Sequence, residues 1–305
     1  MTSVTNSTLA FYRRASAQMG TLRTSAESLE NQLFTGERLS RSSDDPVAAS
    51  RLRMLGRDER LAGIDAANAR RTAENLELAG NALGAMGEDL IRARELVVWA
   101  ASDTIGADER ARIGEELEQL RLRILSSANA RDAGGNALFG GETSGNAYAL
   151  AGSTITYVGT ATAGEIDLGQ GQLMSRGVTG PEVLNFTTGG SPTDVFAFLG
   201  TLASALQGGV PDPVQAARDG LAGIDDAMES ITRAQTVVGT RVAWIEVIED
   251  RQVDQSQTRA ARTAETGGVP FAETVAELQQ MLTVLEASQA GFVKLAGLSL
   301  FDSIR

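Results

Sequence analysis

Pairs and triplets of acidic residues are the side chains in this sequence whose type and spacing could do chemistry. Neighbouring carboxylates can act as a general acid and base, or can hold a calcium ion. The spacing of an EF-hand loop is absent, and each group falls in a predicted helix or at a helix start. We therefore interpret them as capping or solvated residues. The groups are Asp44 and Asp45; Glu115, Glu116 and Glu118; Asp225 and Asp226; and Glu249 and Asp250.

Other catalytic chemistry is limited by what the 305-residue chain lacks. It contains no histidine and no cysteine, which excludes disulfides, the usual zinc sites, thiol catalysis and histidine-based acid–base catalysis. The glycine-rich run 134–145 suggests a phosphate-binding loop, but such a loop needs a lysine, and the one lysine is Lys294. We predict a protein that is not an enzyme, with no catalytic residue, cofactor or metal.

Charge and hydropathy indicate what the chain binds. The formal net charge is -12 and the pI is about 4.6, which argues against binding to nucleic acid or to anionic membrane. We expect protein partners. No apolar run is long enough to span a bilayer, and the first twenty residues do not have the pattern of a cleaved signal peptide.

The stretch from Leu33 to Leu55 separates two helical patterns and predicts a hinge. Gly36 can adopt the left-handed conformation that ends a helix. Asp44 or Asp45 can cap the next helix, and Pro46 suits its first position. An ordinary helical hairpin would have the same stop and start signals.

Each end of the chain carries a narrow apolar stripe. Between Leu9 and Leu33 apolar residues recur three, four or seven apart, and from Val275 onward they occupy successive a and d positions of a heptad repeat. We predict that the two terminal helices pair as a coiled coil and that leftover apolar surface contacts neighbouring subunits. The predicted assembly residues are Leu22, Leu29, Leu278, Leu282, Leu285 and Phe292.

Between these ends the pattern predicts a mainly α protein with one β-rich insertion. Heptad-spaced apolar residues run from Leu76 to Val97, from Ile113 to Ala128 and from Leu221 to Ile248. Short β-type runs alternate with glycine-rich turns in the middle, which favours antiparallel hairpins, although a flexible loop would share this composition. We expect terminal assembly helices at 1–44 and 267–305, a helical body at 45–142 and 194–266, and the insertion at 143–193.

Four blocks of the sequence resemble one known family. The run GERLSRSSDDPVAAS (36–50) resembles the N-terminal signature of the flagellin superfamily, and its Asp-Asp-Pro form resembles the branch at the hook–filament junction; filament flagellins usually have alanine at the proline position. The segment 109–141 and the SLFD ending at 299–302 also resemble this branch, and the segment 238–252 resembles the return helix of flagellin-type proteins. Together the blocks cover the two ends and most of the helical body.

The resemblance implies an elongated flagellin-like helical bundle and a structural role. It implies an adapter outside the cell at the hook–filament junction of the bacterial flagellum, exported without a cleaved signal peptide. The implied partners are hook-associated protein type 1, flagellin, an export chaperone and other copies of the chain in a ring. Two alternatives remain open: a short filament flagellin, and an intracellular coiled-coil scaffold, which the apolar stripes alone would equally permit.

Overall fold

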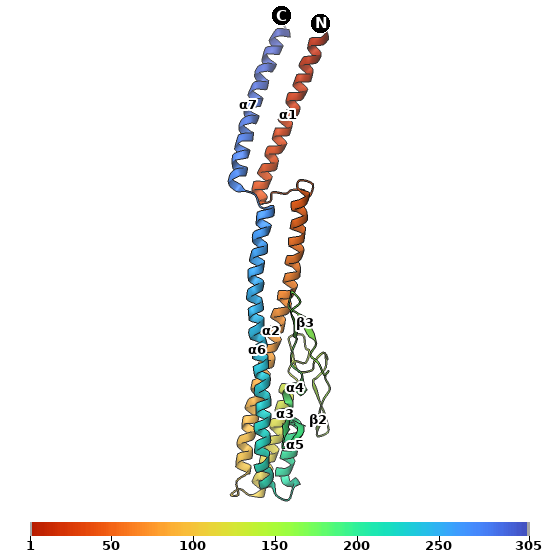
Figure 1. Ribbon diagram of the computed structural model, residues 1–305, viewed down its shortest axis with the longest axis vertical. Helices are drawn as coiled ribbons and strands as arrows, with labels where there is room; N and C mark the ends of the chain where they lie inside the picture. The colour runs from red at the N-terminus through yellow and green to blue at the C-terminus, as the bar shows by residue number, and fades with distance from the viewer. Residues whose placement is uncertain (1, 304–305) are drawn as a thin grey trace. The chain divides into compact units, whose positions relative to one another are not determined.

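The computed structural model describes the backbone of residues 2–303 and the side chains of residues 10–294, so the side chains of the SLFD motif lie outside the described part. Long helices dominate it, and the strands are short (Figure 1). The mainly α class is therefore confirmed. The helices are α1 (Thr2–Thr35), α2 (Pro46–Ala100), α3 (Ala107–Ala128), α4 (Gly180–Leu184), α5 (Val195–Ser204), the π-helix η1 (Ala205–Gly209), α6 (Pro213–Gly267) and α7 (Phe271–Ser303).

The described chain divides into two compact units. The first, called the terminal unit here, contains residues 1–60 and 255–305, and the second, called the central unit, contains residues 61–254. Helices α2 and α6 each contribute residues to both.

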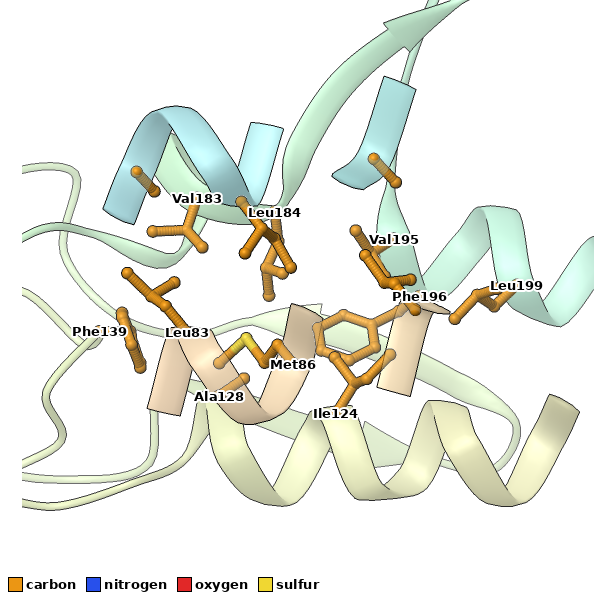
Figure 2. Packing of buried hydrophobic residues seen from close by; sticks show 14 of the residues in the cluster. Leu83, Met86, Ile124, Ala128, Phe139, Val183, Leu184, Val195, Phe196 and Leu199 are labelled. Carbon is orange, nitrogen blue, oxygen red and sulfur yellow. The ribbon is translucent and has the colours of Figure 1, made fainter. Parts of the chain in front are cut away.

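The core of the central unit follows the predicted heptads. In α2 the positions from Leu76 to Val97 at alternating spacings of three and four are at most 2% exposed, and α3 buries Ile113, Leu117, Leu120, Ile124 and Ala128. Figure 2 shows Leu83 and Met86 packed with Ile124, Phe139 and Phe196. These predicted stripes are therefore confirmed. Burial of one apolar face stabilises a long helix whose intrinsic stability is modest.

Close helix packing in this unit depends on glycine. A Cβ atom on Gly114 of α3 would lie 2.7 Å from the main-chain oxygen of Ala203 in α5. One on Gly200 would lie 3.0 Å from Nη1 of Arg121. These two glycines therefore let α3 and α5 approach closely around a buried arginine.

The predicted insertion is built of three antiparallel two-stranded sheets, which confirms hairpins over a flexible loop. Tyr148 pairs with Tyr157, Glu165 with Ser175, and Asn185 with Asp194. The short helix α4 was not expected from the sequence. The strands are β1 (Tyr148–Ala151), β2 (Thr154–Tyr157), β3 (Glu165–Asp167), β4 (Leu173–Ser175), β5 (Asn185–Thr188) and β6 (Ser191–Asp194).

Candidate assembly interface

The terminal helices α1 and α7 lie side by side in the terminal unit, as their stripes predict (Figure 1). The rings of Tyr12 and Phe292 meet edge to face, with centroids 5.4 Å apart and planes at 83°. Such edge-to-face pairs favour a fixed approach of the two elements that carry them. Five predicted assembly residues lie half-buried along the two helices: Leu22, Leu29, Leu278, Leu285 and Phe292.

The sixth predicted residue lies on a different face. Leu282 is 44% exposed, whereas Met281 is half-buried at the corresponding turn of α7. One turn further on, Gln289 takes the next position of the predicted heptad but is exposed, whereas Ser288 is half-buried. The expected heptad register is therefore wrong by one residue at these two turns, and Leu282 points away from the seam between α1 and α7.

The hinge begins where α1 ends, at Gly36. Its φ angle is +73°, and its N–H donates to the main-chain oxygen of Gln32 at 2.8 Å. A side chain is strained in this left-handed conformation, so glycine is the residue that can close the helix here. The predicted helix stop is in place.

The two aspartates of the hinge have different tasks. Asp45 caps α2: its Oδ1 accepts from the N–H of Ala48 at 3.0 Å, and Pro46 is the first residue of the helix. Asp44 instead holds its own loop, because its Oδ2 accepts from the N–H of Arg41 and from the Ser40 hydroxyl. Hydrogen bonds to the carboxylate, first the one from the Ala48 N–H and then that from Arg38, lower the pKa of Asp45.

A second group of hinge residues was missed by the sequence analysis. The first linker (residues 36–45) pairs with the second linker (residues 268–270) and with the end of α6. Glu37 forms an antiparallel bridge with Gly268, the Arg38 N–H donates to the oxygen of Gly267 at 2.8 Å, and the Val269 N–H donates to the oxygen of Gly36 at 3.2 Å. Such main-chain pairing carries no sequence signal apart from its glycines.

The Arg38 side chain joins both linkers. Its Nη2 donates to Oδ2 of Asp45 and to the main-chain oxygen of Thr266, each at 3.2 Å. Gly268 must be glycine, because a Cβ atom there would lie 2.4 Å from the oxygen of Ala264. The hinge therefore fixes the end of α1 to the end of α6 on one side and to the start of α2 on the other.

Several of the acidic residues considered as chemical groups occur in ion pairs. Glu116 pairs with Arg92 at 2.8 Å, and Asp225 pairs with Arg94 at 2.7 Å. Across the described part of the chain, no cluster of three or more metal-ligating side chains is suited to hold an ion. In the same part, none of the helices combines the length and the apolar character that a membrane crossing requires.

Comparison with known proteins gives relatives of one kind. Residues 7–144 match the bacterial flagellin N-terminal helical region. Flagellar hook-associated protein 3 of Escherichia coli K12 is 24% identical over 293 residues, which cover 89% of this chain and 90% of that protein. The same-named protein of Salmonella typhimurium LT2 is 22% identical over 290 residues, covering 90% and 91%.

Solved structures share the fold. A candidate flagellar hook-associated protein of Vibrio parahaemolyticus is 23% identical and superposes with a TM-score of 0.67, covering 74% of this chain and all of that one. The expected flagellin-like fold is therefore confirmed.

Proposed function

Since this chain belongs to the flagellin superfamily and is a homologue of flagellar hook-associated protein 3, we propose that it is a structural adapter that joins the flagellar hook to the filament. The paired terminal helices carry this proposal. Two helices from opposite ends of the sequence lie together, and the paired linkers hold their bases. A subunit built this way presents both termini as one two-helix module to its neighbours.

The proposed neighbours follow from position in the flagellum. Hook-associated protein type 1 would contact the adapter on the hook side, flagellin would contact it on the filament side, and further copies would complete a ring. The chain would be exported with the help of a flagellar chaperone and would act outside the cell. The net charge of -12 fits protein partners better than nucleic acid or anionic lipid.

The proposed division of labour assigns assembly to residues 1–44 and 267–305 and mechanical support to the helical body at 45–142 and 194–266. The insertion at 143–193 then has neither of these tasks, so its amino-acid sequence is free to vary. Within assembly, we assign packing to Leu22, Leu29, Leu278, Leu285 and Phe292. Leu282, which is exposed beside the seam, suits contact with another subunit.

No catalysis is part of this proposal. The homologues are structural proteins of the flagellum, and the chain has no histidine or cysteine to serve as a base or nucleophile. A short filament flagellin is the alternative within the superfamily, and the relatives of nearly full length favour the adapter.

Deletion of the chain from its own organism tests this function. Cells should form hooks without filaments and release flagellin into the medium, because filament subunits would lack a base on which to polymerise. Expression of the full chain from a plasmid should restore filaments. Cells that lack the chain and still carry filaments of normal length would refute the adapter role.

A further inference from the structure

An apolar groove of about 720 Å³ lies within the terminal unit. Half-buried leucines from the first linker and the start of α2 form one side, and the last turns of α6 form the other. The charged pair Arg259 and Glu59 lines one part of it, with Nε and Oε2 2.6 Å apart. The main apolar lining residues are Leu39, Leu52, Leu55, Ala260 and Ala264.

An exposed aromatic residue lies on another surface of the same unit. Phe34, in the last turn of α1, is 91% exposed, the highest value among the large hydrophobic residues of the described part. It is not among the groove's lining residues, although Gly36, two positions later, is. The chain therefore presents a large apolar side chain and an apolar groove and does not bring them together.

We propose that Phe34 of one copy inserts into this groove of the next copy; the inference rests on the proposed ring of adapters and names the contact that builds it. Charge supports the pairing. Glu30 is exposed one helical turn before Phe34, on the same face of α1. Arg259 is 17% exposed in its side chain and uses Nε for Glu59, while no hydrogen bond from its Nη atoms occurs among the described residues.

The spacings of the two surfaces agree. Glu30 and Phe34 are four residues apart on α1, and Arg259 and Thr263 are four residues apart on α6 along the groove. When α1 of one copy runs in the same direction as α6 of the next, a phenylalanine seated near Thr263 places the Glu30 carboxylate at the height of the Arg259 guanidinium.

A second copy is the occupant because the two patches differ. A contact between two different patches joins copies head to tail. A row of such copies keeps a free Phe34 at one end and a free groove at the other, so it continues into a ring or helix. One phenylalanine buries about 150–250 Å². A stable pair needs about 1,200 Å² or more. The contact therefore forms only where copies are already aligned, as on the tip of a hook.

Cysteine cross-linking tests the contact cleanly because the chain has no cysteine of its own. The full chain carrying both Phe34→Cys and Thr263→Cys is expressed in the deletion strain, and isolated hook–filament structures are oxidised and run on a non-reducing gel. Phe34→Cys also removes the ring, so fewer copies should bind per hook, but the copies that do bind should form a ladder of dimers, trimers and longer chains. Each single variant should remain monomeric, since a head-to-tail contact brings together two different positions.

A matched control replaces Phe34 with another exposed apolar position. Val293 is 69% exposed on α7, so the pair Val293→Cys and Thr263→Cys should give no ladder. Equal ladders from both pairs would overturn the proposed contact, and so would dimers from Phe34→Cys alone. If an antibody locates the chain at the hook tip but no cross-linked ladder forms, the contact is overturned and the adapter role stays intact. If a ladder forms but the antibody locates the chain along the whole filament, the adapter role is overturned and the contact stands.

Removal of the Phe34 side chain tests the contact in a second way. Phe34→Ala should lower the amount of chain bound per hook at least about tenfold, the effect of losing one buried aromatic ring. Phe271→Ala, at a residue that is 66% exposed at the start of α7, should not. Equal occupancy for both variants, with helix content preserved in each, would contradict the insertion of Phe34.

Discussion

Nη2 of Arg38 lies 3.2 Å from the main-chain oxygen of Thr266, a residue 228 positions later in the chain. The same atom reaches Asp45, whose other carboxylate oxygen caps α2. A single guanidinium thus connects the end of α6, the first linker and the start of α2.

Arg38→Ala should loosen the paired linkers. The main-chain bonds between them would lose the side chain that holds Asp45 and Thr266 in place, so the linker would open more often. We expect the Val269 amide to exchange with solvent at least about threefold faster, a modest effect because the ion pair is partly exposed. Arg41→Ala, in the same loop, is the control, and equal exchange in both variants would show that Arg38 has no such role.

Gly36→Ala should destabilise the end of α1. Alanine at a φ of +73° costs about 1 kcal/mol. The control is Gly20→Ala in the middle of α1, where an added Cβ atom would meet no atom within 4 Å. Alanine there should stabilise the helix by up to about 1 kcal/mol. Thermal melts followed by circular dichroism should therefore shift in opposite directions; a shift in the same direction for both would contradict the hinge.

The start of α2 should weaken in acid. Hydrogen bonds lower the pKa of Asp45 in the folded chain, so its contribution is complete above the unfolded pKa of about 3.9 and is lost as the pH falls through the lower, folded value. The protection factor of the Ala48 amide, which compares its exchange rate with that of the unprotected chain at the same pH, should fall over that window. Asp45→Asn keeps an N-cap but cannot titrate, so its protection factor should not change with pH in this way. An unchanged pH profile in the asparagine variant would assign the effect to another group.

Leu285→Asp should separate α1 from α7, because a charge would enter their half-buried seam. The free energy of unfolding should fall by about 1–3 kcal/mol, and a protease should cut both termini early. Cells that carry this variant should not swim. Leu282→Asp is the matched control at the neighbouring exposed face. It should keep the termini resistant to protease. Loss of swimming in Leu282→Asp as well would show that Leu282 contacts another subunit. Protease-resistant termini in Leu285→Asp would refute the packing of Leu285 between α1 and α7.

Regular periodicity made the helices predictable from sequence. The stripe of α2 from Leu76 to Val97 repeats at three and four residues without interruption, and all of it is buried as expected. The register of α7 was less determinate, because Met281 and Leu282 are both apolar and adjacent. Either side chain could have faced α1. The choice depends on how α1 packs against α7, and the sequence pattern of α7 alone does not specify this.

The hinge was predictable where the chemistry is local and not where it is long-range. Gly36, Asp45 and Pro46 act on residues within four positions, so their types alone reveal the helix end and the new start. Arg38 acts on Thr266 across the whole chain, and its partner is a main-chain oxygen, which every residue has. No residue type at position 266 could have revealed the contact.

The adapter role is tested most directly by locating the protein. Intact flagella and isolated hook–basal bodies are labelled with an antibody against this chain followed by immunogold particles. We predict one band of label at the distal end of each hook. Label along the whole filament would contradict it and would make the chain a flagellin, and the absence of label from flagella would leave the intracellular scaffold.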